Sequence, residues 1–167
     1  YCAARSLSAL ARSQGDMEMA HRADGFARRL ADGFGRLFDE SVGFYDSSID
    51  ADTGEKRGAP SNNAVKWENS YCRELTDETA ERCLAFYEKE LICAAGLRPY
   101  PVWCPAYDAD SNQLSCWWPV MSEFYTRLAN RCDRADLLRQ WSGWVEGWAE
   151  RLMCPEGISC YCDNGMP

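Results

Sequence analysis

The chain has 167 residues, a net charge of -8, 46% hydrophobic residues and 13% aromatic residues, which predicts one folded domain over residues 1–167. The acidic balance argues against nucleic acid as a partner, since phosphates require clustered lysine and arginine. It also disfavours an anionic membrane surface, and no apolar run reaches the ~20 residues of a membrane-spanning helix. We therefore expect neither a nucleic-acid nor a membrane partner.

Residues 1–13 read as a helix, and Gln14-Gly15-Asp16 predicts a short connection to a second helix. In residues 16–40, apolar residues recur with helical spacing and predict one buried face: Ala23, Phe26, Ala27, Leu30, Phe34, Leu37 and Phe38. No signal peptide is visible before this helix, and we expect the chain to be a piece of a longer protein.

A long loop, residues 43–75, follows and contains a predicted β-turn at Asp52-Thr53-Gly54 flanked by short extended pieces. The next helix begins after the N-cap Thr76 and is expected to end at Gly96. Its predicted buried stripe contains Ala80, Cys83, Leu84, Tyr87, Leu91, Ala94 and Ala95.

The second long loop, residues 97–120, interleaves aromatic residues with carboxylates and amides, a mixture suited to binding sugar rings. The alternative is a loop that packs its aromatic side chains onto helix ends without a ligand. Asp108-x-Asp110-x-Asn112 imitates the start of a calcium loop, but Gln113 replaces the required glycine. Calcium is therefore not expected here.

Two further helices are predicted, one from Pro119 to Cys132 and one from Asp133 to about Met153. Trp141, Trp144 and Trp148 share a face of the last helix, and this spacing favours a core stripe over a sugar platform. The alternation of short and long connections predicts an all-α fold of antiparallel helical hairpins, with both aromatic loops at one end.

The ten cysteines allow disulfides, a metal site or reduced thiols. Helical positions such as Cys83, Cys93 and Cys132 favour buried thiols, and slightly favour a cytoplasmic location. Cys154-x5-Cys160-x-Cys162 lacks the paired spacing of common zinc sites. We expect no metal and no cofactor.

The sequence contains no nucleophile motif of the G-x-S-x-G type and no phosphate-binding glycine pattern. Acid–base chemistry by carboxylates remains, and sugar hydrolysis is the reaction class that needs little else.

Three segments resemble the glycosidases of the six-hairpin (α/α)6-barrel superfamily, closest to the trehalase, processing α-glucosidase and glycogen-debranching branches. LFDESVGFYDSSIDADTGE is similar to their W-D-E-E-x-G-F-Y-Y-D passage. CWWPVMSEFYTRLANR is similar to Y-W-R-G-P-V-W-P, although the arginine is absent. MCPEGISCYCDNGMP lies where the family has E-Y-Y-D-P-x-T-G.

The resemblance implies an inverting glycoside hydrolase acting on oligosaccharides or glycosides, with a carbohydrate as partner. This chain would be the C-terminal part of the catalytic domain and inactive by itself, because the upstream general acid has no matching position. In strict register the general base falls on Cys160, so Glu156 could take that role only if the segment is shifted. The expected sugar-binding residues are Trp67, Trp103, Tyr107, Asp108, Trp117 and Trp118.

The rival interpretation is a non-catalytic α-helical module that binds carbohydrate or a protein partner through the same loops.

Overall fold

The structure is a computed structural model that describes residues 1–50, 52–56, 58–62, 75–94, 96–109, 116–117, 122–152 and 160–161. For residues 116–117, 148, 151–152 and 160–161 only the backbone is described. The described elements are predominantly helical with short strands, which confirms the predicted helical class in outline. Membership of an (α/α)6 barrel stays a prediction.

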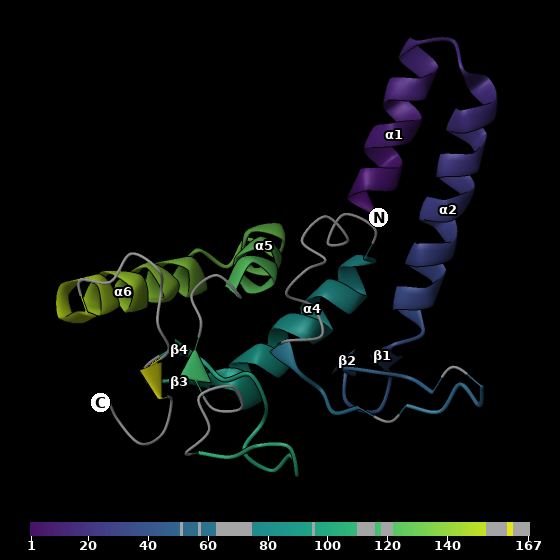
Figure 1. The fold of residues 1–167 in the computed structure, drawn as a ribbon. Helices are drawn as coiled ribbons and strands as arrows, with labels where there is room; N and C mark the ends of the chain where they lie inside the picture. Colours follow the sequence, from purple (N-terminus) through teal and green to yellow (C-terminus); the bar gives the residue numbers. More distant parts are fainter. Residues whose placement is uncertain are drawn as a thin grey trace.

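Helices α1 (Cys2–Ser13) and α2 (Met17–Gly35) form an antiparallel hairpin that projects from the rest of the chain (Figure 1). The short connection contains Gly15 with a φ of 77°, which favours glycine, and Asp16 caps α2 by accepting a 2.9 Å hydrogen bond from the Met19 amide. The buried residues of the two helices are all small: Ala4, Ser8, Ala11, Ala20, Ala23 and Ala27. An ion pair between Arg12 of α1 and Asp24 of α2 adds to this contact.

The predicted buried face of α2 is wrong at two positions, since Phe26 is 51% exposed and Leu30 is 38% exposed. The alanines of α2 form the contact with α1, and they lie on a neighbouring face of the helix. The helix also ends at Gly35, so Phe38 belongs to a strand rather than to the predicted helix. Phe34, Leu37 and Phe38 do pack against the core, as predicted.

Strands β1 (Phe38–Asp39) and β2 (Phe44–Tyr45) pair antiparallel, with Phe38 opposite Tyr45. Gly43, with a φ of 78°, closes the turn by donating a 2.7 Å hydrogen bond to the Asp39 carbonyl. Beyond β2 the predicted turn is confirmed: the Gly54 amide donates to the Asp50 carbonyl, and Ile49 bridges Lys56.

Helix α4 (Asp77–Phe86) begins at the predicted cap, where the Thr76 hydroxyl accepts a 3.1 Å hydrogen bond from the Thr79 amide. A π-helical segment, η2 (Tyr87–Leu91), continues it. The predicted stripe is buried at Ala80, Cys83, Leu84, Tyr87 and Leu91.

The helical turns end at Leu91, before the predicted Gly96. Strand β3 (Ile92–Cys93) turns back and pairs with β4 (Gly96–Leu97). The Arg98 amide donates a 2.8 Å hydrogen bond to the Leu91 carbonyl, and the Arg98 guanidinium donates to the Ile92 carbonyl at 3.0 Å. These bonds satisfy carbonyls that a longer helix would have used.

Helices α5 (Glu123–Arg131) and α6 (Ala135–Leu152) form a second pair, and α5 contacts α4. Asp133, with a φ of 54°, lies in their short connection. Trp141 and Trp144 pack against the core, which confirms the core stripe at those two positions. The side chain of Trp148 lies outside the described residues.

Strand β5 (Cys116–Trp117) pairs antiparallel with β6 (Cys160–Tyr161). The backbone of residues 116–117 in the second long loop therefore lies beside the backbone of residues 160–161. The predicted position of both aromatic loops at one end stays untested, because Trp67 lies outside the described residues.

A buried polar network joins the two long loops inside the core. The Tyr87 hydroxyl donates to the Asn62 side chain, and the Asn62 amide donates a 2.9 Å hydrogen bond to the Pro99 carbonyl. The Ser61 hydroxyl donates to the same carbonyl at 3.1 Å. Because Ser61 and Asn62 are buried, these bonds offset the cost of removing their polar groups from water.

The described cysteine side chains are free thiols: Cys2, Cys83, Cys93, Cys104 and Cys132. Cys83 and Cys104 are buried, which confirms the thiol interpretation for them. The side chains of Cys154, Cys160 and Cys162 lie outside the described residues.

Replacement of one core leucine tests where the core lies. Leu128 is fully buried, so Leu128→Ala should lower the free energy of unfolding by about 2–5 kcal/mol in urea titrations. Leu10, which is 59% exposed, is the matched control. Leu10→Ala should change the free energy of unfolding by less than about 0.5 kcal/mol. An equal loss of unfolding free energy in the two variants would contradict the burial of Leu128 in the core.

Candidate functional site

A cleft of about 520 Å³ lies between the β1–β2 turn, one face of α4 and η2, and the turn that carries Trp103. Its lining residues are Glu40, Ser41, Val42, Gly43, Arg82, Ala85, Phe86, Lys89, Glu90 and Trp103. The cleft thus joins the first segment of the family resemblance, through residues 40–43, to the second long loop, through Trp103.

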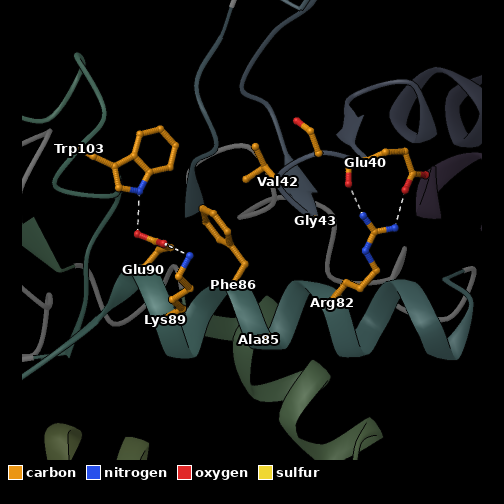
Figure 2. Close-up of a pocket in the computed structure, with 10 residues that line it drawn as sticks. Glu40, Val42, Gly43, Arg82, Ala85, Phe86, Lys89, Glu90 and Trp103 are labelled. Carbon is orange, nitrogen blue, oxygen red and sulfur yellow. Dashed lines mark hydrogen bonds and ion pairs between the residues drawn. The ribbon is translucent and has the colours of Figure 1, made fainter.

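Helical spacing aligns the lining residues of α4 and η2. Arg82, Phe86 and Lys89 follow at intervals of four and three residues, so they share one face. Figure 2 shows Phe86 and Val42 between two polar ends, one formed by Arg82 with Glu40 and the other by Glu90 with Lys89 and Trp103. The cleft therefore has an apolar centre between two charged ends.

At one end, Arg82 holds the β1–β2 turn. Its guanidinium donates to both the side-chain carboxylate and the backbone carbonyl of Glu40, and lies 5.1 Å from the centre of the Phe38 ring. Hydrogen bonding to Glu40 raises the pKa of Arg82 above its ordinary value. A Cβ at Gly43 would make an ordinary contact with Arg82 at 3.6 Å, so the positive φ of 78°, and not a lack of space, favours glycine here.

At the other end, Glu90 fixes Trp103. The indole Nε1–H of Trp103 donates a 2.7 Å hydrogen bond to Glu90 Oε2, while Lys89 Nζ lies 3.0 Å from Glu90 Oε1. The Glu90 side chain is largely buried, whereas Trp103 is 53% exposed. A large aromatic face is thus presented to solvent while its polar edge is hydrogen-bonded.

The charges within this cleft are balanced. Glu40 pairs with Arg82, and Glu90 pairs with Lys89 and Trp103. Each described carboxylate of the lining therefore already has a cationic partner. An arrangement of this kind can bind a neutral, polar ligand with an apolar face.

Of the predicted sugar-binding side chains that the structure describes, Trp103 lines the cleft. Tyr107 is half-buried, Asp108 is exposed, and neither is among the described lining residues; their role in sugar binding stays a prediction. Only the backbone of Trp117 is described. The predicted positions Trp67, Trp118 and Glu156 lie outside the described residues.

Apart from Trp103, sequence reasoning missed the residues that line the cleft, including Glu40, Arg82, Phe86, Lys89 and Glu90. Glu40 lies within the segment LFDESVGFYD, which resembles a glycosidase passage but contains no residue that was predicted to bind sugar. The spacing of the residues from Arg82 to Glu90 predicts that they share a helical face. The sequence does not predict the contacts of this face with Glu40 and Trp103, because each contact connects elements that are separate in the sequence.

The residues that the structure describes contain no cluster of three or more His, Cys, Asp or Glu side chains able to hold a metal ion. Within the same residues, no helix has the length and apolar character needed to span a membrane.

The sequence matches no protein-family profile and no curated protein. The glycosidase resemblance therefore remains a prediction that rests on the three sequence segments.

Asp46, directly after β2, is a buried carboxylate beside the cleft-forming turn and is 4% exposed. Burial raises its pKa, and the negative charge of Asp39 adds to this effect, while Lys56 opposes it. Asp39 itself is held ionised, because hydrogen bonds from Ser41 lower its pKa.

The raised pKa of Asp46 predicts a pH-dependent stability. The folded protein binds this proton more tightly than the unfolded chain, so stability falls as the pH rises from 3.8, the ordinary value, through the folded pKa. Asp46→Asn removes this ionisation. Thermal melts should show the variant gaining stability relative to the parent as the pH rises above 3.8.

Asp50→Asn is the control of opposite sign. Hydrogen bonds from Thr53 lower the pKa of Asp50, so its carboxylate stabilises the fold above pH 3.8. This variant should lose stability relative to the parent as the pH rises towards 3.8, and the difference should stay constant above that pH. An Asp46→Asn difference that is flat with pH would show that Asp46 titrates normally.

Proposed function

We propose that this chain is the sugar-binding part of a helical-hairpin glycoside hydrolase, and that a pyranose ring stacks on Trp103 in the cleft beside α4. The observation that carries the proposal is the hydrogen bond from Trp103 to Glu90. It fixes an exposed indole at the mouth of a concave site, so little side-chain freedom is lost when a ligand stacks on it.

The composition of the cleft supports a neutral sugar. Phe86 and Val42 supply apolar area for the C–H face of a ring, and the paired charges at the two ends supply donors and acceptors for hydroxyl groups. Glu40 and Glu90 are balanced by Arg82 and Lys89, so a strongly charged ligand would gain no net counter-charge here.

Hydrolysis belongs to the same proposal but depends on residues beyond the cleft. Inverting enzymes need a general acid and a general base ~6.5–9.5 Å apart, on opposite sides of the bond that is cleaved. In the proposed enzyme the general base is Glu156, and the general acid comes from outside this sequence. The pairing of Cys116–Trp117 with Cys160–Tyr161 supports this assignment, since residues 160–161, which follow Glu156 by four positions in the sequence, lie beside the aromatic loop.

The second candidate is a non-catalytic carbohydrate-binding module. One observation favours it: both described carboxylates of the cleft are engaged by cations, as a binding surface requires and a catalytic pair does not. Turnover separates the two candidates. A protein that includes the missing acid should hydrolyse glycosides and lose this activity by orders of magnitude in Glu156→Gln, whereas a binding module shows no turnover in either form.

Loss of the indole should remove sugar binding. Trp103→Ala should weaken the binding of maltose at least about tenfold, the equivalent of about 1.4 kcal/mol, in isothermal titration calorimetry. The matched control is Val102→Ala, because Val102 is adjacent and equally exposed, at 56%, but does not line the cleft. This control should bind as the parent does.

Sorbitol, which has hydroxyl groups but no ring face, is the ligand control and should not bind. Maltose binding that survives Trp103→Ala, or that falls equally in Val102→Ala, would contradict the proposed site. Absence of maltose binding by the parent chain, tested together with trehalose and cellobiose, would contradict the sugar proposal itself.

A further inference from the structure

The α1–α2 hairpin has small residues inside and large apolar residues outside. Alanines and Ser8 form the contact between the helices, whereas Leu7, Leu10, Met17, Phe26 and Leu30 are exposed. A helix pair normally buries its largest apolar side chains, because burial contributes roughly 25 cal/mol for each Å² removed from water. Of these exposed residues, Leu7 and Phe26 lie on one side of the hairpin, where both line a groove, whereas Met17 lies on the opposite side of α2 from Phe26. The side with Leu7 and Phe26 exposes large apolar side chains that a partner could bury.

A groove of about 730 Å³ runs along this face. It is lined from α1 by Ala3, Ala4 and Leu7, and from α2 by Met19, His21, Arg22, Ala23, Gly25, Phe26 and Arg29. All of these residues come from two neighbouring helices, and Gly25 lowers one wall, since it has no side chain. A groove between two helices is the shape that receives a third helix.

The positive charge of the groove favours an acidic partner. Arg22 and Arg29 line it, and no carboxylate is among its described lining residues. Neither arginine forms an ion pair with any residue that the structure describes, although Arg29 lies 5.8 Å from the centre of the Phe26 ring. This contrasts with Arg82, Arg131 and Arg134, which are paired with carboxylates. The groove thus combines apolar lining residues with two exposed arginines that have no described carboxylate partner.

We infer that the α1–α2 groove docks an amphipathic helix of a partner protein, whose apolar side chains contact Leu7 and Phe26 and whose carboxylates pair with Arg22 and Arg29. The two arginines are seven residues apart, about 10.5 Å along the helix axis. Carboxylates repeated every seven residues on the partner would match both. This surface is separate from the Trp103 cleft, and the inference does not depend on the proposed sugar binding.

The test uses two synthetic helical peptides with the same leucine stripe, one flanked by glutamates every seven residues and one by lysines. Fluorescence anisotropy measures their affinity for the full chain. The acidic peptide should bind at least about tenfold more tightly than the basic one. The double variant Arg22→Glu with Arg29→Glu should reverse this preference.

Arg28→Glu is the matched control, since Arg28 is exposed on α2 but does not line the groove, and it should leave both affinities unchanged. Leu7→Ala should weaken both peptides, because it removes apolar contact without changing charge. Circular dichroism confirms that each variant is folded. Equal binding of the two peptides, or an equal effect of Arg28→Glu, would overturn the inference.

Light scattering adds a third outcome. A stable dimer of the chain that dissociates in Leu7→Ala would show that a second copy occupies the groove, and would also overturn the proposed heterologous partner.

Discussion

The stacking of Phe44 on Phe86 is the contact on which the rest of the structure depends. Their ring centres are 4.5 Å apart, and Phe44 also meets Tyr87 edge-on at 5.1 Å. The next residue, Tyr45, stacks on Phe34 from α2 at 4.5 Å and approaches Phe124 from α5 at 6.4 Å. Two consecutive residues of β2 therefore hold three helices together.

The same contact positions the cleft. Because Phe44 is anchored on α4, the preceding turn at residues 40–43 lies against the outer face of that helix, where Arg82 binds Glu40. Phe86 serves both purposes, since it packs under Phe44 and lines the cleft (Figure 2). Residues of α4 thus contribute both to the core and to the lining of the cleft. Among the described residues, the α1–α2 hairpin packs against the core through Ala31 and Phe34, near the end of α2.

Local signals in the sequence predicted the helix beginnings and much of the core. The caps Asp16 and Thr76 accept hydrogen bonds from amides three residues away, so the local sequence is enough to predict them. Long-range contacts explain the errors. The helical turns end at Leu91 because Arg98, which follows the β3–β4 turn, donates a hydrogen bond to the Leu91 carbonyl. Phe26 is exposed because the alanines of α2, and not Phe26, form the contact with α1. The site depends on such contacts as well, because Glu90 meets Trp103 only after β3 and β4 fold back.

The central claim is that Glu90 holds the exposed indole of Trp103 ready for a ligand, and the indole N–H resonance of Trp103 tests it most directly. In a chain labelled with ¹⁵N-tryptophan, this resonance is assigned by its loss in Trp103→Phe. The account predicts a proton that exchanges slowly with solvent in the parent and in Glu90→Gln, whose amide oxygen can still accept the bond, and that exchanges rapidly in Glu90→Ala. Equal exchange in the parent and in Glu90→Ala would show that the indole is not held, and would contradict the account.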